Sequence, residues 1–426
     1  MTYLLFAAFM VLVVIDVPIA IALGLSGVLA LWWVGSIPTM LAITRMVAGI
    51  DNFPLLAVPM FVLAGSIMEN GGAAGRLVRL ASALVGFIRG GLGMVVIVAT
   101  ILFSGISGSS VADTAAIGSL MLPAMQKKGY PVEFATALMV SAGGMGILIP
   151  PCITMIIYAF IANTSVGALF IGGIIPGLVM GAGLMVLTYF IARRYGYPAE
   201  AKASAREIWR AFADSAWALL TLVIILVGIV GGVFTATEAA VIVVLYSLVV
   251  GTVIYKELRW SQLPKILLDT AVTSGVVMLV ISTSSIFAWV LANQQIPQKV
   301  AQTLFTLSNQ PWVFLLLVNL LMLVVGCFLD ATPALLILVP ILLPLALRLG
   351  IDPVHFGIVL VANLGIGFIT PPVGVTLFVA TSITGVPIAR VVKPLMPYFL
   401  VMVASLLLIT YVPWFTLALP RLLMNY

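Results

Sequence analysis

Two related stretches decide how this chain folds: GGMGILIPP at residues 143–151 and NLGIGFITPP at residues 363–372. Each pair of prolines removes two backbone N–H donors, and the preceding glycines permit conformations that other residues avoid. A helix that contains such a stretch has to unwind there and leave carbonyl oxygens free. We therefore expect two interrupted helices, one in each half of the chain.

The two stretches belong to an internal repeat with an offset of 221 residues, the distance from Pro150 to Pro371. The same shift places Gly105 on Gly326 and Pro176 on Pro397 without a gap. Because the matches concentrate on Gly and Pro, which determine backbone shape, the halves are expected to share one fold. The boundaries that follow are a first repeat at residues 1–192, a cytoplasmic linker at 193–215 and a second repeat at 216–426.

The composition indicates that the bilayer is the solvent of this protein. Of the 426 residues, 63% are hydrophobic and 8% are charged, against roughly 25% charged in soluble domains. A crossing takes about 20 residues, and only helices satisfy their backbone inside lipid without closing into a barrel. We predict an all-α polytopic membrane protein with about ten transmembrane helices, five in each half. An odd number per half inverts the second repeat, as in many secondary transporters.

Charged residues agree with this topology when both termini lie outside. Of the 19 Lys and Arg residues, 15 then fall in cytoplasmic segments, and only Arg45, Lys299, Arg348 and Arg421 fall outside. Such a bias is the positive-inside rule. The net charge of +6 therefore encodes orientation, and no basic face is large enough to bind nucleic acid.

Polar residues interrupt one apolar segment in each half. In the first half, residues 103–125 read FSGISGSSVADTAAIGSLMLPAM, and its serines and glycines are poor central residues for a straight helix. We expect a re-entrant hairpin at about residues 103–126 and its partner at about 324–346, with tips inside the membrane. Before each hairpin, residues 73–89 and 297–309 are expected to form amphipathic arms that brace a scaffold.

The hairpin tips and the interrupted helices together favour an ion and substrate site. Free carbonyls facing serine hydroxyls offer hard oxygen ligands to a small monovalent cation, and helix N-termini favour an anionic substrate group. The alternative, that the Gly-Pro stretches are only kinks for helix packing, stays open. Asp113 and Asp330 either face this cavity or cap the second helix of their hairpin. Asp16 and Glu238 are expected to be helix caps, and His355 a surface residue.

Enzyme and pump chemistry find little support. One His and two Cys, Cys152 and Cys327, form no metal cluster or redox pair with recognisable spacing. No phosphate-binding loop and no Ser/Lys, His/Glu or paired-Asp catalytic arrangement is present. We expect neither an ATP-driven pump nor an intramembrane enzyme.

The stretches SGISGSSVADTAAIGSLMLPAMQKKGY (104–130) and GVFTATEAA (232–240), with the two Gly-Pro stretches, resemble a known family. They look like the large membrane subunit of tripartite ATP-independent periplasmic (TRAP) transporters, the DctM type. Divalent anion/sodium symporters are similar at a greater distance. The resemblance implies a Na+-driven importer of organic acids (C4-dicarboxylates, sialic acid or sugar acids) in the bacterial inner membrane. It implies an elevator mechanism, a periplasmic substrate-binding protein and a small four-helix membrane subunit, here a separate chain.

The resemblance also implies site residues. One Na+ site would use Ser107, Ser109, Gly146, Ile149 and Pro151, and the symmetric site would use Gly326, Asp330, Gly367, Thr370 and Val373. The substrate would lie near Ser110, Asp113, Thr332 and Asn363. The halves differ here, since Ser107 and Ser109 align with Phe328 and Asp330. A stand-alone Na+/organic anion symporter or antiporter remains the alternative.

Overall fold

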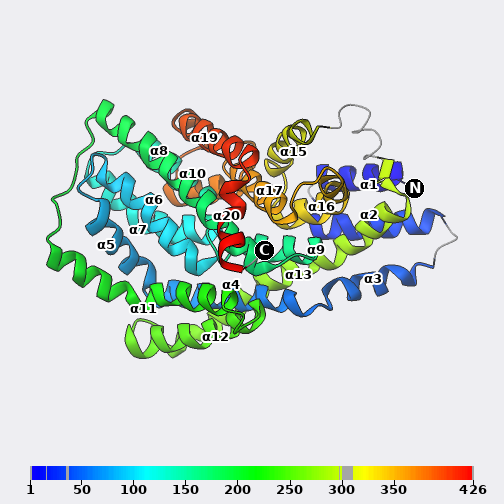
Figure 1. Ribbon diagram of the computed structural model, residues 1–426, viewed down its shortest axis with the longest axis horizontal. Helices are drawn as coiled ribbons and strands as arrows, with labels where there is room; N and C mark the ends of the chain where they lie inside the picture. The colour runs from blue at the N-terminus through cyan, green and yellow to red at the C-terminus, as the bar shows by residue number, and fades with distance from the viewer. Residues whose placement is uncertain (1, 16, 35–37, 297, 300–309, 425–426) are drawn as a thin grey trace.

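The computed structural model describes residues 2–15, 17–34, 38–296, 298–299 and 310–424, and the secondary structure in these residues is helical throughout (Figure 1). This confirms the all-α class. The first half contains α1 (Thr2–Val14), α2 (Ile19–Val34), α3 (Met40–Ile50), η1 (Phe53–Leu56), α4 (Ala57–Asn70), α5 (Ala73–Val85), α6 (Gly91–Ser107), α7 (Ser110–Lys127), α8 (Val132–Gly146), α9 (Ile153–Ala162) and α10 (Val166–Tyr195). The second half contains α11 (Ala205–Val230), α12 (Ala236–Val249), η2 (Val250–Ile254), η3 (Trp260–Gln262), α13 (Leu263–Asn293), α15 (Pro311–Gly326), α16 (Ala331–Arg348), α17 (Pro353–Gly367), α18 (Val375–Thr384), α19 (Ile388–Tyr411) and α20 (Trp414–Met424).

The internal repeat is visible in the helix boundaries. Both ends of α7 are displaced by 221 residues from the ends of α16, and the same holds for α8 and α17. Each interrupted helix forms as expected, since α8 stops at Gly146 before Pro150 and α17 stops at Gly367 before Pro371. Both Pro-Pro peptide bonds are cis. The shared breaks follow from the shared Gly and Pro positions.

The halves exchange contacts around an approximate two-fold axis. A Cβ added to Gly365 would lie 2.4 Å from the carbonyl oxygen of Gly144, and one added to Gly144 would lie 2.7 Å from that of Gly365. These two glycines are equivalent in the repeat and contact each other, so α8 and α17 cross at the axis. On either side, α9 packs on α16 and α17, while its counterpart α18 packs on α7 and α8. Because α10, α19 and α20 also pack on α8 or α17, they form one interlocked body with the hairpins and interrupted helices.

Each hairpin is longer than the sequence indicates. The expected first hairpin began near residue 103, but its first helix, α6, begins at Gly91 and its tip is Gly108–Ser109. The second hairpin pairs α15 with α16, from Pro311 to Arg348, where residues 324–346 were expected. The apolar runs before the polar tips form full helices, which is why the hairpins extend further. The linker is shorter, since only residues 196–204 lie between α10 and α11.

Seven of the described helices are long and apolar enough to cross a membrane, and ten more are apolar but span only 10 to 17 residues. Several short ones are halves of one interrupted crossing, as with α8 and α9. In the first half, residues 51–56, which include η1, also separate α3 from α4. The equivalent residues of the second half, 272–277, continue as helix, so α13 runs unbroken for 31 residues.

Helices outside the interlocked body form an elongated frame. In Figure 1, α1, α2 and α3 lie at one end of the long axis, α5 lies toward the other end, and α11 and α12 run along the lower edge. The long helix α13 packs on α1, α2, α3 and α4 on one side and on α16 of the interlocked body. The expected arm at residues 73–89 is the amphipathic helix α5, packed between α6 and α11. Residue 297 and residues 300–309 of its predicted counterpart lie outside the described residues, as does Asp16.

One arginine anchors the arm to this frame. Arg76 on α5 bonds to the Glu257 carboxylate at 2.6 Å and to the carbonyl of Gly72 at 2.9 Å, and its guanidinium lies 3.7 Å from the ring centre of Tyr255. Its side chain is only 14% exposed. Arg79, three residues on, forms a looser and exposed pair with Asp214 at 3.7 Å. The two arginines therefore make a matched pair for mutation.

Arg76→Ala is expected to lower the free energy of unfolding by about 2 kcal/mol, because charge-assisted and cation–π contacts of a partly buried Arg are lost together. Arg79→Ala should cost less than about 0.5 kcal/mol, since exposed ion pairs contribute little. Thermal unfolding of both variants in detergent measures the difference. Equal effects of the two substitutions would show that Arg76 does not anchor α5.

Candidate ion and substrate site

A buried carboxylate lies at the centre of the first hairpin. Asp113 is in the first turn of α7 and is fully buried. The hydroxyl of Ser104 donates a hydrogen bond to its Oδ2, and the hydroxyl of Ser107 donates to its Oδ1. Ser104 and Ser107 are three residues apart and so share one face of α6. The carboxylate thus ties the two helices of the hairpin together and does not cap α7, contrary to one of the two interpretations left open.

The end of the interrupted helix closes on this cluster. A Cβ added to Gly146 would lie 2.4 Å from Ser104 Oγ and 2.7 Å from Asp113 Oδ2. At the tip, Gly108 adopts φ +66°, and a Cβ there would lie 2.8 Å from the carbonyl oxygen of Pro151. The amide of Ile153 donates to the carbonyl of Gly108 at 3.4 Å. Glycine at 108 and 146 lets the backbone of the break approach the hairpin tip.

The frame supplies the remaining wall. A Cβ added to Gly65 on α4 would lie 3.0 Å from the carbonyl oxygen of Ser107, so α4 packs directly on the tip. The oxygen atoms that could bind a cation here come from two hydroxyls, one carboxylate and the backbone carbonyls between α8 and α9. Hard cations prefer such oxygen ligands. Na+ has this character, so the residues present fit the implied ion.

The other residues predicted for the first Na+ site have varied roles. Ser109 is the N-cap of α7, and its hydroxyl accepts from the amide of Ala112 at 3.4 Å. Ile149 is buried and its amide donates to the carbonyl of Gly146 at 3.0 Å. Pro151 presents its carbonyl to the tip, as described above. The structure therefore brings Ser107, Gly146 and Pro151 together with Asp113, whereas Ser109 already has a structural role.

The second predicted set is arranged differently. Gly326 packs on Gly367, with 2.6 Å between the Gly326 Cα and a Cβ added to Gly367. Thr370 donates its hydroxyl to the carbonyl of Ile366 at 2.6 Å. Asp330 occupies the N-cap position of α16 without a side-chain cap bond and is exposed, and Val373 is 47% exposed. In the second half, Val325 and Ala334 take the places of Ser104 and Asp113. The second hairpin therefore has no counterpart of the buried Asp113 carboxylate.

Of the residues predicted for substrate, Ser110 and Thr332 are buried in the first turns of α7 and α16. The Ser110 hydroxyl has no hydrogen-bond partner among the described residues. Asn363 donates through Nδ2 to Asn319 Oδ1 at 2.8 Å and to the carbonyl of Val359 at 2.8 Å, and its Oδ1 has no partner in the described chain. It therefore faces α15 within a polar network.

That network corrects one expectation. His355 is buried, where we expected a surface residue. Its Nδ1 lies 2.8 Å from Thr416 Oγ1 and its Nε2 lies 3.1 Å from the carbonyl of Thr410. Thr410 in turn accepts from Asn319 at 3.1 Å. Partners that lie more than 50 residues away along the chain were not visible in the sequence. Glu238 is a helix cap as expected, because it forms a capping box with Thr235.

Ser104 is the site residue that sequence reasoning missed. The sequence did hold a signal for it. Ser104 and Ser107 are spaced for one helix face, and Asp113, in the first turn of the next helix, follows across a tight Ser-Gly turn.

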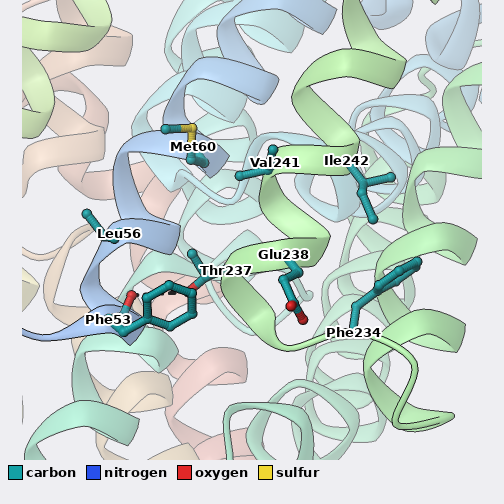
Figure 2. Close-up of a pocket in the computed structure, with 8 residues that line it drawn as sticks. All are labelled: Phe53, Leu56, Met60, Phe234, Thr237, Glu238, Val241 and Ile242. Carbon is teal, nitrogen blue, oxygen red and sulfur yellow. Dashed lines mark hydrogen bonds between the residues drawn. The ribbon is translucent and has the colours of Figure 1, made fainter.

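A groove elsewhere in the structure does not offer a second ion or substrate site. Figure 2 shows it between η1, α4 and α12, lined by Phe53, Leu56, Met60, Phe234, Thr237, Glu238, Val241 and Ile242. Thr237 donates to the carbonyl of Phe53 and Glu238 caps α12, so its remaining lining is apolar.

Comparisons with known proteins agree on one family. A family model described as "Tripartite ATP-independent periplasmic transporter, DctM component" matches residues 6–415. A C4-dicarboxylate TRAP transporter large permease protein of Pseudomonas aeruginosa is 43% identical, covering 94% of both chains. A sialic acid TRAP transporter large permease protein of Vibrio cholerae is 43% identical over 90% of both chains. The crystal structure of the Alcanivorax borkumensis YdaH transporter has a TM-score of 0.64 over 89% of both chains, with 19% identity, and so shows a shared fold.

Proposed function

The chain belongs to the DctM family of tripartite ATP-independent periplasmic transporters, as its large permease subunit, and we propose that it couples Na+ entry to the import of an organic acid. It is a multi-pass membrane protein, and its family implies a small membrane subunit and a periplasmic binding protein as partners. Two of the similar permeases are described for C4-dicarboxylates and for sialic acid. Both substrates carry carboxylates, so we propose a carboxylate-bearing acid here.

The observation that carries the proposal is the cluster of Ser104, Ser107 and Asp113 against Gly146. Na+ would be held here by the two hydroxyls, the carboxylate and the nearby carbonyl of Pro151. A buried carboxylate without a cationic partner is costly in a membrane, and the two serine hydroxyls only partly compensate for it. A monovalent cation would neutralise the Asp113 carboxylate, so that the site no longer repels an anionic substrate.

The substrate would bind between the two hairpin tips. The unpartnered hydroxyl of Ser110 and the buried hydroxyl of Thr332 stand at the first turns of α7 and α16, where N–H groups and the helix dipole favour a carboxylate. No Lys or Arg side chain is buried among the described residues. The acid is therefore held by hydroxyls, backbone N–H groups and the ion. Asn363 would act from α17 by accepting a hydrogen bond from a substrate hydroxyl through its free Oδ1.

Movement would take the form of an elevator. The interlocked body of α6 to α10 and α15 to α20 would carry ion and substrate past the frame of α1 to α5 and α11 to α13. The frame would stay fixed with the small subunit in the inner membrane, with the basic side of the chain in the cytoplasm and both termini in the periplasm. The continuous α13, packed on both α2 and α16, suits the role of a fixed rail.

The proposal is tested by uptake into proteoliposomes that contain the complete complex and the cognate binding protein. Across a panel of organic acids, uptake of at least one carboxylate should require an inward Na+ gradient and the binding protein. Uptake without the binding protein would support the stand-alone symporter instead. Uptake that ignores the Na+ gradient would overturn the coupling.

The double variant Ser104→Ala, Ser107→Ala should raise the Na+ concentration for half-maximal uptake by about tenfold or more, since even one lost polar contact to a charged group is worth about 1.5 kcal/mol. Ser119→Ala is the matched control on α7, because the Ser119 hydroxyl only donates to the carbonyl of Ala116. An unchanged Na+ response of the double variant would show that the ion binds elsewhere.

A further inference from the structure

A second pocket, of about 510 Å³, opens where α8 and α19 begin and α10 ends. Its lining residues come from all three helices and from the loop after α10: Pro131, Glu133, Phe134, Ile191, Arg194, Tyr195, Tyr197, Lys393, Pro394 and Pro397. None of them takes part in the ion and substrate site. The pocket therefore needs an explanation of its own.

Two cations converge on this pocket without a carboxylate partner. Arg194 is in the last turn of α10 and Lys393 is on α19, and both are exposed. Neither forms an ion pair with any carboxylate in the described part of the chain. Glu133 is the single acid among the lining residues, so the lining carries an excess of one positive charge. Free cations that face a shared cavity favour an anion.

The start of α8 adds to the preference for an anion. Pro131 is the N-cap of α8 and provides no side-chain cap, so the first N–H groups of the helix remain available at the rim of the pocket. Helix N-termini bind phosphate and carboxylate through such groups. Cationic side chains and a helix N-terminus from different elements thus point to the same kind of ligand.

The other walls are apolar and aromatic. Tyr197 packs on Phe134 with ring centres 5.2 Å apart and on Tyr195 at 6.1 Å. Ile191, Pro394 and Pro397 complete the lining. A small soluble anion gains nothing from contact with apolar walls, whereas an acyl chain packs favourably against them. Tyrosines beside basic residues at helix ends are also typical of the membrane interface.

We propose that this pocket binds an anionic phospholipid, with its phosphodiester between Arg194 and Lys393 and an acyl chain along Phe134 and Ile191. Basic pockets between transmembrane helices recognise anionic headgroups in this way. The bound lipid would bridge α8, α10 and α19, which all belong to the interlocked body. The inference needs neither Na+ coupling nor the identity of the substrate, so it stands independently of the proposed function.

The test is native mass spectrometry of the delipidated complex titrated with phosphatidylglycerol and with phosphatidylcholine. Phosphatidylglycerol should bind more tightly, and Arg194→Gln combined with Lys393→Gln should weaken it roughly 30-fold, from about 1 kcal/mol for each cation near the surface. The matched control is Arg193→Gln with Arg390→Gln, which removes two exposed cations from the same two helices outside the lining.

Three results would overturn the proposal. Phosphatidylglycerol binding that survives the Arg194 and Lys393 substitutions would place the lipid elsewhere. Equal weakening by the control pair would indicate general surface charge. Glycerophosphoglycerol, which has the headgroup without acyl chains, should bind far more weakly than the lipid, and equal affinity would make the occupant a soluble phosphodiester. Because the altered side chains are exposed, each variant should unfold at the temperature of the unmodified complex.

Discussion

Asp113→Asn should abolish Na+-driven uptake, with a loss of at least about 100-fold, because removing one partner of a buried charge interaction costs about 3 to 5 kcal/mol. The carboxylate is fully buried and accepts from both Ser104 and Ser107. An amide has no net charge to balance a cation, and its NH2 group would face a hydroxyl that now donates. Both effects act directly on the proposed ion site.

Uptake is measured in proteoliposomes with an inward Na+ gradient and the binding protein present. Asp269→Asn serves as the control, since Asp269 is an exposed acid on α13, and it should transport normally. Copurification of the small subunit shows whether the Asp113 variant still assembles. Normal transport by the assembled Asp113 variant would reduce Asp113 to a link between the two hairpin helices.

Gly365→Ala should destabilise the fold by about 2 to 3 kcal/mol, since overpacking against a rigid neighbour costs that much. The new Cβ would lie 2.4 Å from the carbonyl oxygen of Gly144. That oxygen belongs to the backbone of α8 and cannot rotate away, so the two helices would have to separate at the axis of the repeat. The hairpins packed on α8 and α17 would move with them.

Thermal unfolding of the purified complex measures this effect. Gly275→Ala is the matched control, because Gly275 is also inside a helix but has open space around its Cα. Alanine there should leave the unfolding temperature unchanged or raise it, in line with its higher helix propensity. If both substitutions behaved alike, the crossing of α8 and α17 would not be a close backbone contact.

Much of the fold could be predicted because Gly and Pro act locally. Pro150, Pro151, Pro371 and Pro372 interrupt their helices wherever those helices pack, so the repeat and its breaks are visible in the sequence alone. The full length of the hairpins could not be predicted in this way. Their first helices are uniformly apolar, so no residue in the sequence marks their starts at Gly91 and Pro311. The second helix of each hairpin, against which the first one packs, lies on the other side of the tip.

The candidate site was predictable in part for the same reason. Ser107, Gly146 and Asp113 belong to short conspicuous stretches, and they do meet in the structure. Ser104 belongs to the same stretch but becomes recognisable only when α6 and α7 pair. Ser109 shows the opposite case. A serine that could bind an ion can also cap a helix, and the Ser109 hydroxyl accepts a hydrogen bond from the backbone of α7 instead. His355 was misplaced because Thr410 and Thr416 reach it only through tertiary packing.

The two halves repeat one backbone plan, yet their interrupted regions differ in exposure. Pro151 and Cys152 are buried, whereas Pro372 and Val373 are exposed. The two cysteines of the chain fall one at each region, with Cys152 directly after the first break and Cys327 at the tip of the second hairpin, where it is half-buried. Comparing the labelling rates of these two native thiols therefore measures the difference in exposure without any engineered residue. In a conformation that exchanged the environments of the halves, the order of reactivity of the two native thiols would reverse.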